Sequence, residues 1–256
     1  MADYPDFALD GQAALVTGAA RGLGRSIALA LADAGADVAL GLRTKDTADD
    51  LIQQIEAMGR RAIAVQMDVT QLEQLAPAIQ AVVAHFGRLD ILVNNAGLGP
   101  GNAAEEVTET DFDLTMDVNL KGLFFACQAA GRVMIRQGSG RIINIGSQAG
   151  FVALPGEAIY CASKAAVSHL TKCLAIEWGR FGVAVNAVAP TFIRTDGTAA
   201  DLADPTFEAD VRERIAGLHR IGDTMDVAGG VIFLASPASS LVTGTTLLID
   251  GGWTAR

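Results

Sequence analysis

The sequence predicts an α/β fold, a single domain built on a doubly wound, seven-stranded parallel sheet with helices on both faces. Short apolar runs alternate with amphipathic stretches, which is typical of strand–helix–strand units. Of the 256 residues 50% are hydrophobic and 19% are charged, a balance that supports a substantial core. No linker, internal repeat or low-complexity segment divides the chain, so we expect one domain over residues 1–256.

Seven apolar runs are the candidate strands. Most are apolar almost throughout rather than alternating with polar residues, so helices should cover both faces of the sheet. In chain order the candidates are Ala13–Thr17, Asp37–Leu42, Ala62–Met67, Ile91–Asn94, Arg141–Ile145, Val183–Val188 and Thr245–Ile249.

Apolar residues at helical spacing between these runs predict crossover helices. One series is Leu72, Leu75, Ile79, Val82, Val83 and Phe86, and another is Leu51, Ile55 and Met58. Right-handed crossovers place the ligand site of such a sheet at the carboxyl ends of its strands, near the switch point of the strand order. The region Thr191–Gly222 is weakly periodic and rich in Asp, Gly and Thr, which predicts an irregular substrate lid over about 191–222.

The composition argues against several classes of partner. A formal net charge of -10, with no run of Lys or Arg, opposes binding to nucleic acid or to an anionic membrane. Residues 1–12 are acidic and do not resemble a secretory signal, and no apolar stretch approaches the ~20 residues of a membrane-spanning helix. We therefore expect a cytoplasmic protein with no nucleic acid or membrane partner.

Cysteine and histidine spacing bears on redox state and metal binding. Cys127, Cys161 and Cys173 lack CxxC spacing and sit inside apolar segments, which predicts reduced, buried thiols and favours the cytosol. The three histidines are scattered and form no HExxH or Cys/His cluster. No catalytic metal is expected.

A glycine-rich turn, Thr17–Gly24, directly follows the first candidate strand and opens a helix led by Ile27 and Leu31. Glycines there allow a tight turn and let the backbone approach a pyrophosphate, whose charge the free N–H groups of the helix start attract. The glycine spacing is GxxxGxG rather than GxGxxG, and an ordinary glycine-bearing turn is the alternative. The position of the turn, at the ligand end of the first strand, favours nucleotide binding.

The end of the second strand bears on which dinucleotide binds. NAD sites usually carry an Asp or Glu there to hold the adenosine 2′-hydroxyl, but the chain reads Gly41-Leu42-Arg43-Thr44. A carboxylate at Leu42 would accept the ribose hydroxyls, whereas Arg43 and Arg21 can pair with a 2′-phosphate. NADP(H) is therefore favoured. Asp46 keeps NAD(H) open, and solvated surface charge is the other interpretation of the two arginines.

A tyrosine, a lysine and a serine form a candidate acid/base site. Tyr160 and Lys164 share one face of the helix predicted over Gly156–Trp178, so the ammonium can lower the tyrosine pKa by favouring phenolate. A tyrosine–lysine pair at this spacing is more often a surface contact. Ser147 weakens that alternative, because it follows the fifth strand at the ligand end, where its hydroxyl can donate to a carbonyl oxygen.

These motifs together closely resemble the short-chain dehydrogenase/reductase family, whose Rossmann fold and activity the resemblance implies over nearly the whole chain. The motifs stand in family order: the turn Thr17–Gly24, Asp68-Val69, Asn94-Asn95-Ala96-Gly97, Asn119, Ser147, Tyr160-Cys161-Ala162-Ser163-Lys164 and Asp250-Gly251-Gly252. The sequence departs from the family at two places, since it reads Pro190-Thr191 where Pro-Gly is frequent and Ala184 where an arginine is frequent.

The resemblance implies a role for each catalytic candidate. Tyr160 is the acid/base, and Ser147 stabilises the substrate oxygen. Lys164 lowers the tyrosine pKa and binds the nicotinamide ribose, and Asn119 holds a proton-relay water against it. Asn95 helps to fix the central strands. The cofactor-binding set is Gly18, Arg21, Gly22, Leu23, Gly24, Arg43, Asp68, Val69, Asn95, Ala96, Gly97, Tyr160, Lys164, Pro190, Thr191, Ile193 and Thr195, with Asp68 and Val69 at the adenine.

The resulting hypothesis is an NAD(P)(H)-dependent oxidoreductase that moves a hydride between nicotinamide and a secondary alcohol or ketone. A catalytically inert sensor or scaffold of the same fold is the alternative from another class. Among enzymes, the 3-oxoacyl-thioester reductases and the sugar or polyol dehydrogenases remain open. The family also implies a homotetramer, with the helix of Tyr160 and the apolar segment Phe124–Ile135 packing against a second subunit.

Overall fold

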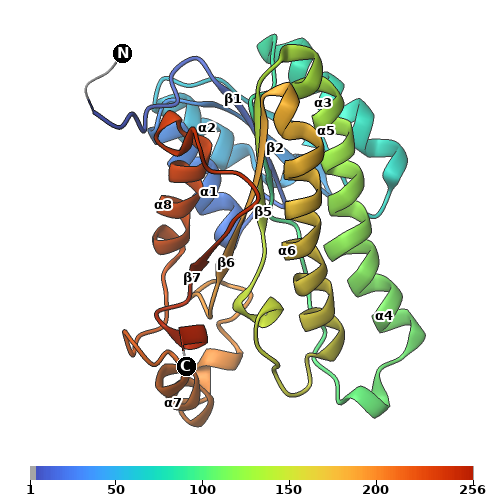
Figure 1. Ribbon diagram of the computed structural model, residues 1–256, viewed down its shortest axis with the longest axis vertical. Coiled ribbons are helices and arrows are strands. Elements are labelled where there is room, and N and C mark those ends of the chain that lie inside the picture. The colour runs from blue at the N-terminus through green and yellow to red at the C-terminus, as the bar shows by residue number, and fades with distance from the viewer. Residues whose placement is uncertain (1–3, 256) are drawn as a thin grey trace.

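A single parallel sheet organises the chain (Figure 1). The computed structural model describes residues 4–255, and of Asp46 only the backbone, so the first three residues of the acidic amino-terminal stretch and the Asp46 carboxylate lie outside the described part. The strand order is β3-β2-β1-β4-β5-β6-β7, and all neighbouring strands are parallel. The order reverses between β1 and β4, which confirms the doubly wound α/β fold and fixes the switch point.

The strands agree closely with the predicted runs, and their ends differ from the predicted ends by at most two residues. They are β1 (Ala13–Thr17), β2 (Asp37–Leu42), β3 (Ala62–Gln66), β4 (Ile91–Asn94), β5 (Gly140–Ile145), β6 (Val183–Pro190) and β7 (Thr246–Ile249).

Side chains of the inner strands point alternately into two cores, one on each face of the sheet. In β1, Ala14 and Val16 pack on one face, and Ala13 and Leu15 on the other. Burial on both faces explains why the strands are continuous apolar runs. The helices over the first core are α1 (Gly22–Asp33), α2 (Asp49–Ala57) and α8 (Thr224–Ala235), and those over the second are α3 (Leu72–Phe86), α5 (Leu123–Gln137) and α6 (Ala158–Trp178).

One expectation about burial is wrong, and one strand is less buried than the others. β7 is the last strand of the sheet and is only partly buried, with Leu248 39% exposed. Cys127 is buried in the second core, but Cys161 is only partly buried and Cys173 is exposed, because α6 turns that side to solvent. Within residues 4–255, no helix is long and apolar enough to cross a membrane.

The segment predicted to be the lid, residues 191–222, is more regular than the sequence predicts. It contains α7 (Pro205–Arg214), whose start is marked by Asp204, because this carboxylate accepts a hydrogen bond of 2.9 Å from the Thr206 amide and proline follows at the first helical position. The helix buries Val211 in a third, small core together with Ile215 and Trp253. The expected irregular excursion is therefore wrong over these residues, since a helix with so little buried surface shows weak periodicity.

Candidate active site

A cavity of about 400 Å³ opens at the carboxyl ends of the central strands, beside the switch point. Ser147 follows β5, Thr191 follows β6, and Tyr160 and Lys164 enter the cavity from the first turns of α6. The structure therefore brings three of the four predicted catalytic side chains into one cavity. The fourth, Asn119, lies behind its wall.

Hydrogen bonds fix the positions of the serine and the lysine. The Lys164 ammonium donates to the Ile145 carbonyl at 2.9 Å and lies 5.6 Å from the centre of the Tyr160 ring. The Ser147 hydroxyl donates to Gln148 Oε1 at 2.7 Å and accepts the Ala149 amide at 3.1 Å. Both side chains are nearly fully buried, so little freedom remains for other rotamers.

The acid/base properties of the pair differ from the expectation. Burial raises the pKa of Tyr160 above its usual value near 10, and a hydrogen bond with Ser147 opposes that shift. Burial lowers the pKa of Lys164 to about 8. The expected lowering of the tyrosine pKa by Lys164 is therefore not seen for the side chains of this chain alone, because burial is the largest cause of the shift and Lys164 is not among its causes.

Asn119 supports the wall of the cavity from behind. It lies in a π-helical segment, Asp117–Gly122, which joins α4 (Glu109–Met116) to α5. Its side-chain amide accepts the Leu98 N–H at 2.9 Å and donates to the Leu98 carbonyl at 2.7 Å and to the Ser163 hydroxyl at 3.0 Å. Asn119 thus ties the loop after β4 to α6, and a π-helical turn at such a point is common in functional sites.

The glycine-rich turn is held against the loop after β4. Gly18 adopts a φ of +66°, and a Cβ on Gly24 would overlap the Gly18 carbonyl and the Asn95 amide. The Asn95 amide donates to the carbonyls of Thr17 at 3.0 Å and Gly18 at 3.2 Å, and the Thr17 hydroxyl accepts the amides of Asn95 and Ala96. Glycine is therefore required here by both the turn and the close approach of the two loops.

The structure has the features that a dinucleotide requires. The amino terminus of α1 has no side-chain cap and no acidic residue in its first turn, so its N–H groups and its partial positive charge are free for a pyrophosphate. Across the gap, Thr195 lies 3.5 Å from the position of a Cβ on Gly22. The Thr191 hydroxyl is buried and has no hydrogen-bond partner among residues 4–255, so it is available to a bound group.

Two arginines, one just after β2 and one in the glycine-rich turn, are candidates for holding a 2′-phosphate. Arg43 and Arg21 are both exposed, and neither has a carboxylate partner in the part of the chain that the structure describes. Leu42 is 1% exposed and belongs to the first core. The role of a carboxylate at Leu42 in holding the ribose stays a prediction, because the burial of the leucine side chain does not test it.

The predicted cofactor residues fall into two groups. Those that line the cavity are Leu23, Asn95, Gly97, Tyr160, Lys164, Pro190, Thr191, Ile193 and Thr195. Those outside its lining are Gly18, Arg21, Gly22, Gly24, Ala96, Arg43, Asp68 and Val69. Of these, Asp68 is held by Thr70, whose amide and hydroxyl both donate to Asp68 Oδ1.

Sequence reasoning missed several residues that line the cavity. Gln148 is 2% exposed and follows Ser147, whereas Glu157 stands one helical turn before Tyr160. Adjacency to the catalytic candidates was a usable signal for these two. Leu154, Phe192 and Asp201 also line the cavity, but they come from loops whose course the sequence did not predict.

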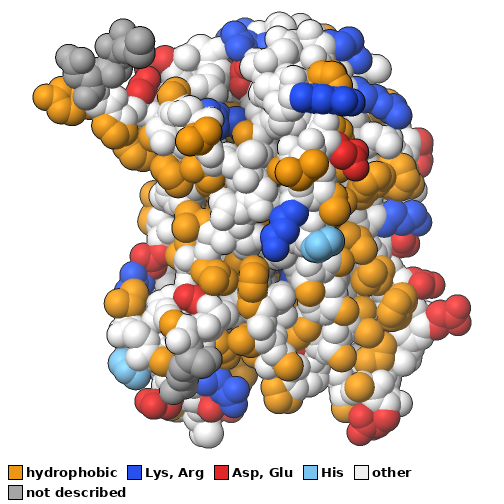
Figure 2. Space-filling model, viewed as in Figure 1, with side chains coloured by type: hydrophobic (Ala, Val, Ile, Leu, Met, Phe, Trp, Pro, Cys, Tyr) orange, Lys and Arg blue, Asp and Glu red, His pale blue; other side chains and the backbone are white. Residues whose placement is uncertain are grey.

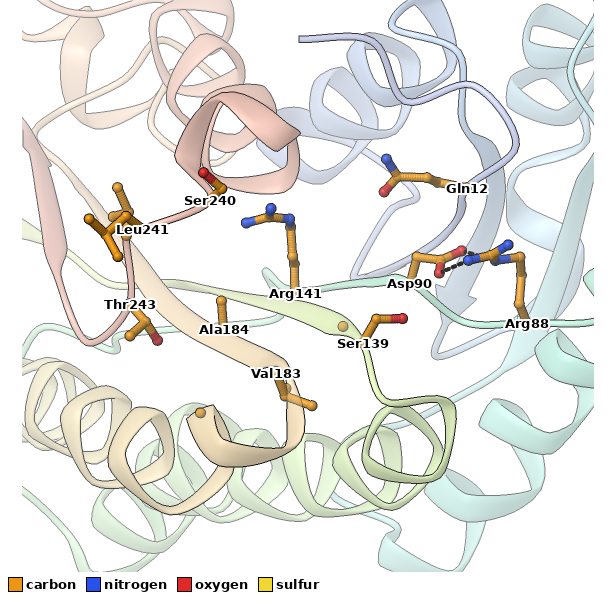
Figure 3. Close-up of a pocket in the computed structure, with 14 residues that line it drawn as sticks. Gln12, Arg88, Asp90, Ser139, Arg141, Val183, Ala184, Ser240, Leu241 and Thr243 are labelled. Carbon is orange, nitrogen blue, oxygen red and sulfur yellow. Dashed lines mark hydrogen bonds and ion pairs between the residues drawn. The ribbon is translucent and has the colours of Figure 1, made fainter. Parts of the chain in front are cut away.

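A second cavity, of about 430 Å³, lies at the opposite, amino-terminal edge of the sheet (Figure 3). Arg141 projects into it and donates to the Ser239 hydroxyl at 3.1 Å, while Arg88 is paired with Asp90. Ala184, where the resembling family often has an arginine, is the register partner of Arg141, and its small side chain helps to leave this space. No tyrosine, lysine or cysteine lines this second cavity, so we place the chemistry in the first.

Comparisons with known proteins agree with this placement. Residues 18–254 match the family model described as enoyl-(acyl carrier protein) reductase. The chain is 43% identical to 3-oxoacyl-(acyl-carrier-protein) reductase of Staphylococcus aureus, over 94% of this chain and 97% of that protein. It is 40% identical to D-threitol dehydrogenase of Mycolicibacterium smegmatis, over 98% of this chain and 96% of that protein.

A solved structure shares the whole architecture. A gluconate 5-dehydrogenase from Burkholderia cenocepacia, in complex with NADP and tartrate, is 38% identical to this chain. The TM-score is 0.94, and the match covers 98% of both chains. Relatives with different alcohol or ketone substrates therefore share one backbone with this protein.

Proposed function

Because the chain belongs to the short-chain dehydrogenase/reductase family, we propose that it transfers a hydride between NADP(H) and the carbon of a secondary alcohol or ketone. The observation that carries the proposal is the convergence of Ser147, Tyr160 and Lys164 on one cavity at the carboxyl ends of the strands, next to the uncapped start of α1. An inert sensor of the same fold has no need for these three side chains in one place, so an enzyme is the better supported alternative.

The proton chemistry follows from the environment of Tyr160. Its raised pKa keeps the phenol protonated near neutral pH, so the phenol can donate a proton to a carbonyl oxygen as negative charge develops there. The Ser147 hydroxyl would stabilise the same oxygen by exchanging its bond to Gln148 for one to the substrate. Bound NADP(H) would supply or accept the hydride, and Thr191 and Ile193, which line the cavity, are among the residues that would hold it.

The uncapped start of α1 indicates where a pyrophosphate would lie, and the family resemblance implies the other cofactor contacts. The turn Gly18–Gly24 and Thr195 would hold the pyrophosphate, with Asp68 and Val69 at the adenine and Lys164 at the nicotinamide ribose. Arg21 and Arg43 would hold the 2′-phosphate through charge-assisted hydrogen bonds. The NADP in the Burkholderia dehydrogenase supports this choice.

A thioester reductase remains the second candidate, and the 43% identical Staphylococcus reductase favours it. The lid offers no unpaired basic patch for an acidic carrier protein, because its arginines bond to neighbouring carboxylates. We therefore rank a dehydrogenase of sugars, polyols or other small secondary alcohols first.

Tyr160→Phe tests the mechanism. The variant keeps the aromatic ring but lacks the phenol hydroxyl that donates the proton. Turnover should therefore fall by about 10²–10⁴-fold or more, while NADP(H) binding is unchanged. Turnover is followed by the absorbance of the reduced cofactor over a broad panel of alcohols and ketones, and circular dichroism controls for folding. Wild-type turnover in the folded variant would contradict the mechanism. A wild type that binds NADP(H) and turns over nothing in the panel would favour the inert alternative.

We also propose a cytoplasmic homotetramer. The free thiols of Cys127, Cys161 and Cys173 support a reducing compartment. Hydrophobic side chains lie over the face formed by α5 and α6 (Figure 2). A groove there is lined by Met116, Leu120, Phe124, Phe125 and Leu170 together with the ion pair of Asp117 and Lys121. A surface of this kind is typical of a subunit interface.

A further inference from the structure

We propose that Glu157 makes the cavity select uncharged polyhydroxy alcohols and ketones over the carboxylate counterparts of the same carbon chain. The inference rests on the function proposed above and concerns the substrate of that same cavity. It narrows the substrate class of sugars and polyols proposed above. The distinction matters because one relative is named for a neutral polyol, D-threitol, and another for a sugar acid, gluconate.

The Glu157 carboxylate lies inside the cavity and close to the reacting centre. Glu157 is the residue before α6 and stands one turn ahead of Tyr160. Its oxygens reach across to the loop after β4, where Oε1 lies 3.0 Å from the position of a Cβ on Gly101 and Oε2 lies 3.3 Å from that on Gly99. A Cβ on Gly99 would also press against the Tyr160 ring, so the carboxylate and the phenol share one wall.

Nothing in the described residues neutralises this carboxylate. Glu157 is half-buried, and neither a hydrogen bond nor an ion pair engages its carboxylate oxygens within residues 4–255. Burial and the charge of Asp201, which lies on the lid side of the cavity, both raise the pKa of Glu157. The cavity therefore already disfavours negative charge, and a substrate carboxylate would add to that repulsion.

Among the described residues of the cavity and the lid, no lysine or arginine is left free to hold a substrate carboxylate. Lys164 is the only lysine or arginine among the described residues that line the cavity, and its ammonium donates to the Ile145 carbonyl beside the proposed proton-transfer site. The arginines of the lid are engaged elsewhere: Arg194 and Arg212 with Glu208, Arg214 with Asp210 and Arg220 with Asp226. A sugar acid would have to break one of these ion pairs or remain unpaired.

The same wall suits hydroxyl groups. The carboxylate of Glu157 accepts hydrogen bonds and so matches hydroxyl donors next to the reacting carbon. Gln148 complements it, because its Oε1 accepts from Ser147 while its amide nitrogen has no partner among the described residues. Gln148 is 2% exposed and lines the cavity, so little of its side chain meets bulk solvent. A chain of hydroxyls offers both the donor and the acceptor that these two side chains require.

Two matched pairs of ligands test the inference, D-threitol with D-threonate and D-sorbitol with D-gluconate. Within each pair the carbon chain is the same and only the terminal group changes from alcohol to carboxylate. We expect wild-type kcat/KM with NADP⁺ to favour the neutral member by at least about tenfold. Glu157→Gln should reduce that preference by about tenfold, mainly through a lower KM for the acids. Asp196→Asn, which removes an exposed lid carboxylate outside the cavity, should leave the preference unchanged.

Binding separates this inference from the proposed function. In the Tyr160→Phe background, the affinity of each ligand for the NADPH complex is measured from cofactor fluorescence, with and without Glu157→Gln. Preferential binding of the neutral members without turnover by the wild type supports the inference and contradicts the proposed function. Equal or tighter binding of the acids, an unchanged preference in Glu157→Gln, or no binding of any of the four ligands overturns the inference.

Discussion

Lys164 is held in the protein at a cost in stability. It is 4% exposed, its ammonium donates to the Ile145 carbonyl, and no carboxylate pairs with it in the described part of the chain. A buried ammonium without a counter-charge loses most of its hydration, which the lowered pKa of about 8 reflects. The native fold is therefore less stable than it would be with an apolar side chain at this position.

Lys164→Met should raise the free energy of unfolding of the cofactor-free protein by about 1–2 kcal/mol at pH 7. The folded pKa of about 8 lies below the ordinary value of 10.5, so between these pH values the unfolded chain holds more protons and the wild type becomes more stable as pH rises. The advantage of methionine should thus shrink at pH 10. Urea denaturation at both pH values measures it, and Lys172→Met, on an exposed side of α6, is the control. A variant less stable than wild type at pH 7 would contradict this account.

We also expect single residues to decide whether NADP(H) or NAD(H) binds more tightly. Arg43→Ala should weaken NADPH binding by roughly 1.5–3 kcal/mol, the scale of one hydrogen bond to a charged group, and should leave NADH binding nearly unchanged. Fluorescence titration of both reduced cofactors measures the effect, with Arg136→Ala, an exposed arginine on α5, as the matched control. Equal losses for the two cofactors, or a wild type that prefers NADH, would show that Arg43 is only a surface charge.

At the scale of single residues, the sequence predicted which side chains come together, but it did not predict how deeply their surroundings bury them. The spacing of Tyr160 and Lys164 and the place of Ser147 after β5 were enough to bring them to one cavity. The direction of the tyrosine pKa was wrong, because desolvation depends on loops whose packing no local pattern encodes. The burial of Leu42 was likewise not predicted, since the direction of its side chain depends on the strand pleat and the helices above it.

At the scale of elements, predictability followed the amount of buried surface. Each strand was found to within two residues, because a strand between two helix layers needs an unbroken apolar run. The lid helix α7 was missed, since Val211 is its one fully buried side chain among the described residues, although Asp204-Pro205 marks its start. The π-helical segment around Asn119 has no sequence signal that we can identify, because it depends on how α4 and α5 join against α6.

At the scale of the whole molecule, the apolar surface that a single chain leaves exposed to solvent gives the strongest indication that several chains assemble. α6 leaves Ile176 84% exposed, and the groove between α4, α5 and α6 is almost entirely apolar. β7 adds a second uncovered area around Leu248. Two separate apolar areas permit two kinds of two-fold contact, which is the arrangement needed for a closed tetramer with dihedral symmetry.

We therefore expect light scattering to report a particle of four 26.5 kDa chains at micromolar concentration. Phe124→Glu should reduce it to a smaller species, because a two-fold contact repeats each substitution and would bring two carboxylates together in an apolar interface. Leu241→Glu changes a side chain that is 97% exposed and lies outside this groove, so it should leave the mass unchanged. A stable wild-type monomer would contradict the tetramer. If both variants retained the mass of four chains, the interface would have to lie elsewhere than α5 and α6, and the exposed edge of β7 would become the surface to test next.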